Sequence, residues 1–206
     1  LKKNNIKFTH SGITSSKNCF DKIITKKIIS KKNILTAKYK LLKKKEFNFE
    51  ELSILKKKYK KFVIKPNRSG SSYGIKLIKT NKDFTDFIRE IETYKNKILM
   101  HDEILVEEFI SGKELTVSTI NFSKKINALA VTEIKSKNSF FDYQAKYSSG
   151  YSKHILPANL SKKIYEQCLK IAIKTHKLMG CNSIARTDFI YNQKKNKIYF
   201  LEINTQ

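Results

Sequence analysis

Several features that would assign a chain to a particular class of protein are scarce or missing in this sequence. No apolar run approaches the length of a membrane-spanning helix, and no secretory signal peptide is recognisable. The cysteines, Cys19, Cys168 and Cys181, are odd in number and form no Cys-x-x-Cys pair. Neither a disulfide framework nor a zinc site is therefore indicated. We expect a cytoplasmic protein without a membrane partner.

Arginine is also rare. The 43 basic residues outnumber the 18 acidic ones and give a formal charge of +25, but only Arg68, Arg89 and Arg186 are arginines. Arginine is the residue best suited to bidentate contacts with phosphates and bases. The lysines are scattered through every segment among Asn, Ile, Tyr and Phe, whose codons are all A/T-rich, so a biased genome explains the charge. A lysine-rich nucleic-acid-binding module is the less favoured alternative, and no nucleic-acid partner is expected.

What the chain does contain is enough apolar surface for a folded core. It has 206 residues, of which 40% are hydrophobic and 11% aromatic. This composition predicts a globular protein with one good core or two small subdomains that share a cleft.

Periodicity and turn signals predict alternating helices and strands. Helices are expected over 17–30 (capped by Ser15 and Ser16), 47–59, 81–98 and 161–179, and strands over 62–65, 75–78, 104–109, 114–121, 126–134, 183–191 and 197–203. Residues 135–153 are polar and without a period, which indicates a long loop of the kind that forms a lid or is disordered. Hairpins dominate, so the predicted fold class is α+β with antiparallel sheets.

The last hairpin carries a set of polar residues that suits a metal ion. Strand side chains alternate between faces, so Arg186 and Asp188 share one face, as do Glu202 and Asn204. If the two faces coincide, two carboxylates, an amide and an arginine converge, and such oxygen ligands suit Mg²⁺. The sequence does not fix the register, and for the hairpin alone an ordinary surface ion pair between Arg186 and Glu202 is the favoured alternative.

A second candidate is the glycine- and serine-rich segment 65–74. Lys65 ends a strand, and the small residues that follow would let backbone N–H groups approach an anion. The segment lacks the GxxxxGK[ST] spacing of the common phosphate-binding loop. A plain flexible hairpin tip is equally compatible with it.

Two further segments carry charged residues that fit a nucleotide. The strand with Glu107, followed by a turn and Glu114, could offer carboxylates to an amine and to a ribose diol, although an ordinary acidic edge strand explains it as well. Lys146 lies among aromatic residues in the long loop. It could reach a transferred phosphate or could simply be solvated.

Taken in order, these segments resemble the D-alanine–D-alanine ligase family. The resemblance rests on KPNRSGSSYG (65–74), VEEFISGKELTV (106–117), FDYQAKY (141–147), Arg186-Thr187-Asp188 and LEINT (201–205). Gly12 and Asp21-Lys22 are also similar to that family. The Asp-Tyr-x-Ala-Lys-Tyr loop is the most specific of these, since most ATP-grasp ligases do not carry it.

The resemblance implies an ATP-grasp fold, in which two α+β subdomains clasp ATP between antiparallel sheets. Residues 1–105 would form the central subdomain and residues 106–206 the C-terminal one. ATP would phosphorylate the carboxylate of one D-alanine, and the amine of a second would attack the acyl phosphate, giving D-alanyl-D-alanine for peptidoglycan synthesis. Ligation of D-alanine to D-lactate, or of another carboxylate to an amine, is the alternative within the same family.

The resemblance also implies roles for individual residues. Those that would contact ATP are Lys22, Lys65, Ser71, Ser72, Glu107, Glu108, Phe109, Glu114, Phe140, Lys146 and Leu201. Two Mg²⁺ ions, or Mn²⁺ in their place, would be held by Asp188, Glu202 and Asn204. The residues that would act in the reaction itself are Arg186, Ser71 and Lys146.

The family also has an N-terminal domain and a C-terminal loop that would lie before Leu1 and beyond Gln206. We therefore expect the 206-residue chain alone not to turn over. A homodimer is an expectation for the full-length enzyme.

Overall fold

The computed structural model describes residues 2–6, 8–70, 73–93, 96–122, 125–136 and 152–205. These residues fold as two compact units. Unit 1 comprises the described residues of Leu1–Thr36, Ser111–Lys137 and Ser152–Gln206, and unit 2 those of Ala37–Ile110. Each unit has its own sheet and its own core.

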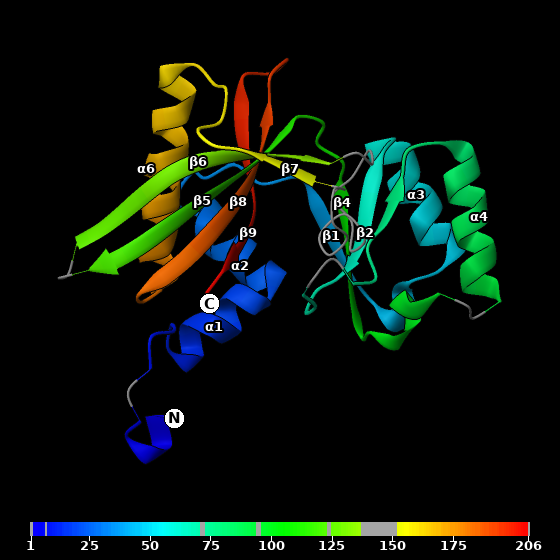
Figure 1. The fold of residues 1–206 in the computed structure, drawn as a ribbon. Helices are drawn as coiled ribbons and strands as arrows, with labels where there is room; N and C mark the ends of the chain where they lie inside the picture. The colour runs from blue at the N-terminus through cyan, green and yellow to red at the C-terminus, as the bar shows by residue number, and fades with distance from the viewer. Residues whose placement is uncertain are drawn as a thin grey trace. The chain divides into compact units, whose positions relative to one another are not determined.

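Unit 1 is built on a five-stranded antiparallel sheet (Figure 1). Its strand order is β7-β6-β5-β8-β9. The strands are β5 (Lys113–Phe122), β6 (Lys125–Ser136), β7 (Ser152–Ile155), β8 (Ile184–Asn192) and β9 (Lys197–Asn204). The pairs β5–β6 and β8–β9 are the two antiparallel hairpins predicted from the alternation of their residues.

Three helices accompany this sheet, namely α1 (Ile13–Phe20), α2 (Lys22–Ser30) and α6 (Lys162–Leu178). Helix α6 packs against β5, β6 and β8, and it ends before Gly180, whose φ of 62° suits glycine. The core joins apolar side chains of the helices and of one face of the sheet, among them Ile29, Leu115, Val117, Ile164, Cys168, Ala172, Ala185, Phe189, Phe200 and Ile203.

The structure divides the predicted helix 17–30 into two helices. Asp21 has extended backbone angles (φ −86°, ψ 104°) and its carboxylate accepts a hydrogen bond from the backbone N–H of Ile24 at 3.0 Å. It is thus the N-cap of α2, because short acidic side chains satisfy the free N–H groups of a first turn. The predicted caps Ser15 and Ser16 lie inside α1, which begins after Gly12.

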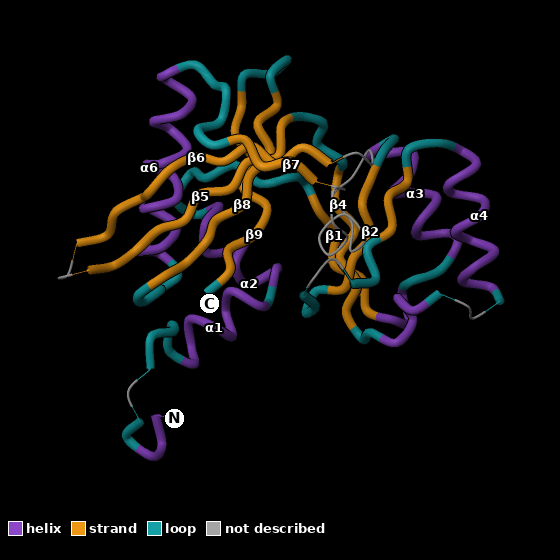
Figure 2. Tube along the Cα trace, viewed as in Figure 1, coloured by secondary structure: helices purple, strands orange, loops and turns teal. Residues whose placement is uncertain are grey.

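Unit 2 has a four-stranded antiparallel sheet in the order β1-β4-β2-β3 (Figure 2). Its elements are β1 (Tyr39–Lys43), α3 (Phe49–Tyr59), β2 (Phe62–Pro66), β3 (Lys76–Ile78), α4 (Asn81–Glu92) and β4 (Glu103–Glu108). Single 3-10 turns at Lys2–Asn4, in unit 1, and at Lys44–Glu46 and Lys97–Met100, in unit 2, complete the two units. Apolar residues of α3 and α4 pack on one face of the sheet, including Leu52, Leu55, Phe62, Ile64, Phe84, Phe87, Ile104 and Val106.

Two features of unit 2 differ from the predicted elements. Strand β1 was not predicted, and α4 ends at Glu92 instead of near residue 98. The predicted division at residues 105 and 106 also differs from the observed one. Strand β4 pairs with β1 and β2 in unit 2, whereas the described part of 1–36 belongs to unit 1. Pairing between distant strands decides the division, and the sequence pattern does not reveal such pairing.

Candidate active site

The polar residues of the last hairpin lie on one face of the sheet of unit 1. In the antiparallel pairing of β8 with β9, Asp188 lies opposite Glu202 and Arg186 lies opposite Asn204. On the other side of β8, Thr116 of β5 lies opposite Asp188. Residues opposite one another in a sheet share a face, so the structure fixes the register that the sequence left open.

Asp188 is the centre of this cluster. Its Oδ1 accepts hydrogen bonds from Thr116 Oγ1 at 2.6 Å and from Arg186 Nε at 3.1 Å. Its Oδ2 accepts from Arg186 Nη2 at 3.1 Å and from Asn204 Nδ2 at 3.2 Å. The alternative prediction for this hairpin was an ion pair between Arg186 and Glu202. Arg186 instead pairs with Asp188, in the bidentate geometry that gives the strongest such contacts.

The electrostatics of the cluster favour an added positive charge. Burial raises the pKa of Asp188, the Arg186 guanidinium opposes that effect, and the negative charge of Glu202 raises the pKa further. Bringing two carboxylates together out of water costs free energy unless cations compensate. A divalent cation at this face would stabilise both ionised carboxylates.

The ligand set of this face suits Mg²⁺. Asp188 and Glu202 offer carboxylate oxygens and Asn204 an amide oxygen, which are hard donors. Among the described residues, no three His, Cys, Asp or Glu side chains gather in a way that could hold a metal ion. An ion at this face would therefore complete its coordination shell with the amide, water and phosphate oxygens.

A β-bulge at Leu201 sets the faces of β9. Asp188 lies opposite Glu202, but Phe189 lies opposite Phe200, so Leu201 has no partner in the pairing. Phe200 and Ile203 consequently both point into the core. In a regular strand Phe200 and Glu202, which are two positions apart, would share a face, so the bulge is what allows Phe200 to enter the core while Glu202 lies on the polar face.

In unit 2, the candidate residues Lys65 and Glu107 form a buried ion pair across β2 and β4. Their side chains are 10% and 5% exposed. The register places Val63 opposite Glu107 and Lys65 opposite Leu105, so the two charged residues are diagonal neighbours on one face. Glu107 also raises the pKa of Tyr39 through its negative charge, after the larger effect of burial.

Glu108 and Phe109 were predicted to contact a base through their backbone. The N–H of Glu108 donates to Lys38 O at 2.8 Å and that of Phe109 to Lys61 O at 2.9 Å. A base at this position must therefore use other atoms of these residues, or these hydrogen bonds must change. The Lys79 ammonium lies 5.1 Å from the centre of the Phe109 ring.

The remaining predicted residues are distributed as follows. Lys22 is buried at the first position of α2, beside its N-cap Asp21. Glu114 is half-buried on β5, and its charge helps to raise the pKa of Arg186. Ser71, Ser72, Phe140 and Lys146 lie outside the described residues, as do residues 137–151 of the predicted loop 135–153. The two ends of that predicted loop belong instead to strands β6 and β7.

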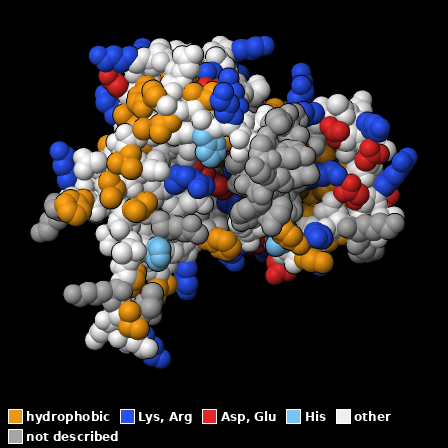
Figure 3. Space-filling view, in the orientation of Figure 1, with side chains coloured by type: hydrophobic (Ala, Val, Ile, Leu, Met, Phe, Trp, Pro, Cys, Tyr) orange, Lys and Arg blue, Asp and Glu red, His pale blue; other side chains and the backbone are white. Residues whose placement is uncertain are grey.

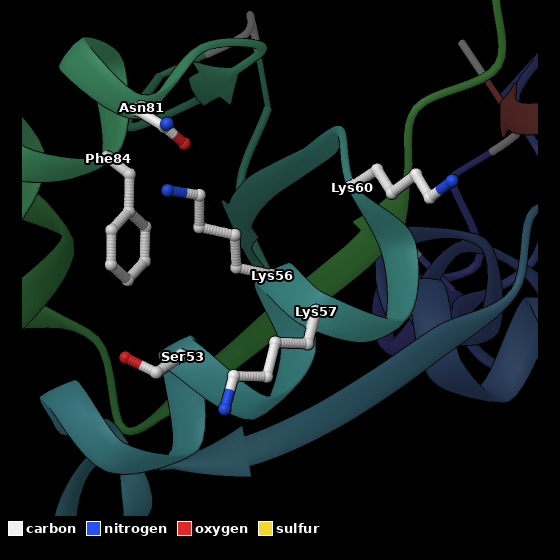
Figure 4. Close-up of a pocket in the computed structure, with 6 residues that line it drawn as sticks. All are labelled: Ser53, Lys56, Lys57, Lys60, Asn81 and Phe84. Atoms are coloured by element: carbon white, nitrogen blue, oxygen red, sulfur yellow. The ribbon is translucent and has the colours of Figure 1, made fainter.

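A separate hollow of about 460 Å³ lies in unit 2 between α3 and the start of α4 (Figure 4). It is lined by Ser53, Lys56, Lys57, Lys60, Asn81 and Phe84. The Lys56 ammonium lies 4.5 Å from the centre of the Phe84 ring, while Lys60 points away from the others. None of the predicted site residues lines this hollow, so it is not the candidate active site.

The comparisons with known proteins identify the family. The family model described as the C-terminus of D-ala D-ala ligase matches residues 28–206. The chain belongs to the D-alanine–D-alanine ligase family. The predicted family is thereby confirmed.

Curated relatives of the chain are D-alanine–D-alanine ligases. One from Carboxydothermus hydrogenoformans is 37% identical over 203 residues, covering 97% of this chain and 63% of the relative. One from Wolbachia pipientis wMel is 35% identical, covering 97% of this chain and 59% of the relative. The chain thus spans about three fifths of the length of these relatives.

Solved structures confirm the predicted α+β, ATP-grasp fold class. D-alanyl-alanine synthetase A from Vibrio cholerae matches with a TM-score of 0.82 and 25% identity over all of this chain and 61% of that structure. The D-alanine–D-alanine ligase from Bacillus anthracis matches with a TM-score of 0.77 and 28% identity, covering 100% and 62%. A structure of the latter ligase is a complex with ATP.

Sequence reasoning missed the residues that support the site. Thr116 carries no distinctive motif, and only the pairing of β5 with β8 shows that it contacts Asp188. A buried carboxylate outside the site was also missed. Glu133 lies opposite Leu115 on the core face of the sheet and accepts a hydrogen bond from Lys113 Nζ at 2.9 Å.

Proposed function

We propose that the protein joins two D-alanine molecules in an ATP-dependent reaction, giving D-alanyl-D-alanine for peptidoglycan synthesis. The observation that supports this most strongly is the cluster of Arg186, Asp188, Glu202 and Asn204 on one sheet face of a member of this family. The proposed enzyme works in the cytoplasm, with Mg²⁺ and ATP, and as a homodimer.

Asp188, Glu202 and Asn204 are the residues that would hold two Mg²⁺ ions. When bound, these ions would supply positive charge that offsets the negative charge developing during phosphoryl transfer. The Arg186–Asp188 bidentate pair fixes the guanidinium beside the proposed ions. Arg186 would stabilise charge at the reacting carboxylate of the first D-alanine, and its pairing with Asp188 supports this role.

Phosphoryl transfer would proceed by attack of that carboxylate oxygen on the γ-phosphorus of ATP, with ADP leaving. Little covalent chemistry falls to the protein, which instead positions the groups and supplies positive charge. Lys22, Lys65 and Lys146 would contact the phosphates, and Ser71 and Ser72 would close over them.

Peptide bond formation would follow by attack of the second D-alanine's amine on the acyl carbon, with loss of inorganic phosphate and of the amine proton. Exclusion of water protects the acyl phosphate from hydrolysis at this stage. Glu107, Glu108, Phe109, Glu114, Phe140 and Leu201 would hold the adenosine throughout. The Lys65–Glu107 ion pair supports this assignment because it holds a phosphate ligand and a base ligand side by side on one sheet.

The test is D-alanine-dependent phosphate release from Mg²⁺-ATP by the protein translated from its complete coding sequence. We expect D-alanyl-D-alanine as the product, identified by mass spectrometry. Asp188→Asn and Glu202→Gln should each lower kcat by roughly 100-fold or more, since they remove charge that stabilises the transition state. The exposed turn variant Lys194→Ala should retain the wild-type rate. Turnover that is absent in the wild type, or unchanged in both site variants, would refute the proposal.

A different acceptor is the second candidate. The VanG D-Ala:D-Ser ligase from Enterococcus faecalis has a TM-score of 0.77 and 28% identity to this chain, which supports a related reaction equally well. Comparing D-alanine, D-serine and D-lactate as acceptors in the same assay distinguishes these reactions.

Nucleic-acid binding is less well supported. Lys and Arg side chains are spread over the visible face in Figure 3, with Asp and Glu side chains among them. They do not line a single stripe there, as a duplex would require.

A further inference from the structure

Two buried cysteines of unit 1 lie together although 162 positions separate them in the sequence. Cys19 is in the last turn of α1, and Cys181 is in the connection between α6 and β8. Their Sγ atoms are 4.0 Å apart, and each residue is 8% exposed. Both cysteines are therefore largely shielded from solvent.

Hydroxyl groups surround the Cys181 sulfur. Ser15 Oγ donates to Cys181 Sγ at 3.7 Å. Ser11 Oγ accepts from Asn182 N at 3.0 Å, which holds it beside the same connection. Hydrogen-bond donors aimed at a sulfur favour its thiolate form.

The two thiols consequently differ in acidity. The hydrogen bond from Cys19 lowers the pKa of Cys181 to about 7, with Ser15 and Ser11 adding to that effect against the opposing effect of burial. The hydrogen bond to Cys181, burial and the Cys181 charge all raise the pKa of Cys19. Cys181 is thus the nucleophile of the pair, and Cys19 keeps its proton.

We propose that Cys19 and Cys181 form a redox site at which a hydroperoxide oxidises Cys181 and Cys19 then closes a reversible disulfide. In the first step the Cys181 sulfur attacks one peroxide oxygen and the O–O bond breaks. With hydrogen peroxide, the sulfur becomes a sulfenic acid and the other oxygen leaves as hydroxide, which becomes water by taking up the proton that the Cys181 thiol released to solvent on ionising.

In the second step the Cys19 sulfur attacks the Cys181 sulfur and the S–O bond breaks. Water leaves with the Cys19 proton, so two thiols and one hydrogen peroxide give one disulfide and two waters. Loss of the Cys181 charge in the first step removes one cause of the raised pKa of Cys19. The sulfurs must approach by about 2 Å, from 4.0 Å to the length of an S–S bond.

The third cysteine provides a contrast. Cys168 is fully buried in α6, and burial raises its pKa to about 12. A thiol in apolar surroundings reacts slowly. Cys168→Ala is therefore the matched control for the two cysteines of the redox site.

The test is treatment of the reduced protein with hydrogen peroxide, followed by peptide mapping without reductant. We expect a linked peptide that contains Cys19 and Cys181, with the loss of two hydrogen atoms, reversed by a thiol reductant. The same link should form in Cys168→Ala. Because a disulfide constrains the unfolded chain, the midpoint of thermal unfolding should rise by roughly 5–10 °C.

Variants separate the two steps. Cys19→Ser should stop at a sulfenic acid on Cys181 that dimedone traps, and Cys181→Ser should form neither product. A missing Cys19–Cys181 link in the folded wild type, or a link that involves Cys168, would overturn the proposal.

A measurement on the wild type alone covers the case in which these variants fail to fold. Iodoacetamide should label Cys181 first, with a rate that rises through about pH 7 as the thiolate forms. Equal labelling rates at the three cysteines would count against the proposed site.

Discussion

At the scale of single residues, the site depends on neighbouring residues that local sequence patterns do not reveal. The alternation rule alone places Arg186 with Asp188 and Glu202 with Asn204, and the structure shows that the two pairs share a face, which the sequence left open. Thr116 was not predicted, because its contact with Asp188 follows from pairing between strands 72 positions apart. Long-range pairing of this kind is invisible to local patterns.

Thr116→Val tests the support of Asp188. The change keeps the shape of the side chain and removes the hydroxyl that donates to Asp188 Oδ1 at 2.6 Å. A hydrogen bond to a charged, buried group contributes about 1.5–3 kcal/mol, so the free energy of unfolding in urea should fall by that amount. Thr132→Val is the control, since Thr132 lies opposite Thr116 on β6 and carries the same chemistry. An equal loss in both variants would argue against a specific role of Thr116.

At the scale of elements, local signals predicted most helices and strands, and the errors have physical causes. Asp21 interrupts the predicted first helix because it caps a second one. Helix α4 ends at Glu92 although the apolar pattern continues to Ile98, which instead belongs to a short 3-10 turn capped by Asn96. Such ends depend on capping contacts more than on periodicity.

The start of α4 gives a pH-dependent prediction. Thr80 Oγ1 accepts from Asp83 N at 3.0 Å, while Asp83 Oδ2 accepts from the N–H groups of Lys79 and Thr80, each at 2.8 Å. These backbone hydrogen bonds lower the pKa of Asp83. Its contribution to stability is therefore present above its unfolded value of 3.8 and is lost as the pH falls through the lower folded value.

Asp83→Ala should lower the free energy of unfolding by about 1 kcal/mol at pH 7. The difference from the wild type should vanish in acid, below the folded pKa. Urea unfolding of both proteins at several pH values measures this difference in the free energy of unfolding. Asp86→Ala, in the next turn of the same helix, should cost less, because its 4.0 Å ion pair with Arg89 joins two exposed side chains. A cost that did not change with pH would contradict the capping role.

The β-bulge gives a second prediction at this scale. Deletion of Leu201 should turn β9 into a regular strand in which Glu202 follows Phe200 directly, so Glu202, Ile203 and Asn204 should keep their present faces. Phe200 and Ile203 would stay in the core, so the protein should still fold at 25 °C. Leu201→Ala keeps the register and should leave a folded protein, as near-UV circular dichroism would show. Loss of folding in the deletion variant, with Leu201→Ala still folded, would contradict the assignment of Leu201 as the extra residue of the bulge.

At the scale of the whole molecule, two independent cores explain how the chain is organised. The sequence predicted two α+β subdomains, but not that the segments of unit 1 come from three separate parts of the chain. The family resemblance supplied what periodicity could not, namely the order of the motifs and the chemistry that they share. The roles of Ser71, Ser72, Phe140 and Lys146 stay predictions.

The most direct test of the central claim is calorimetric titration of the protein, translated from its complete coding sequence, with ATP in the presence and absence of Mg²⁺. We predict that nucleotide binding requires Mg²⁺. Asp188→Asn and Glu202→Gln should each weaken this binding by at least about tenfold, or 1.4 kcal/mol. Circular dichroism would verify that both variants keep their fold. Binding that is independent of Mg²⁺, or equal in the wild type and the two variants, would contradict the account.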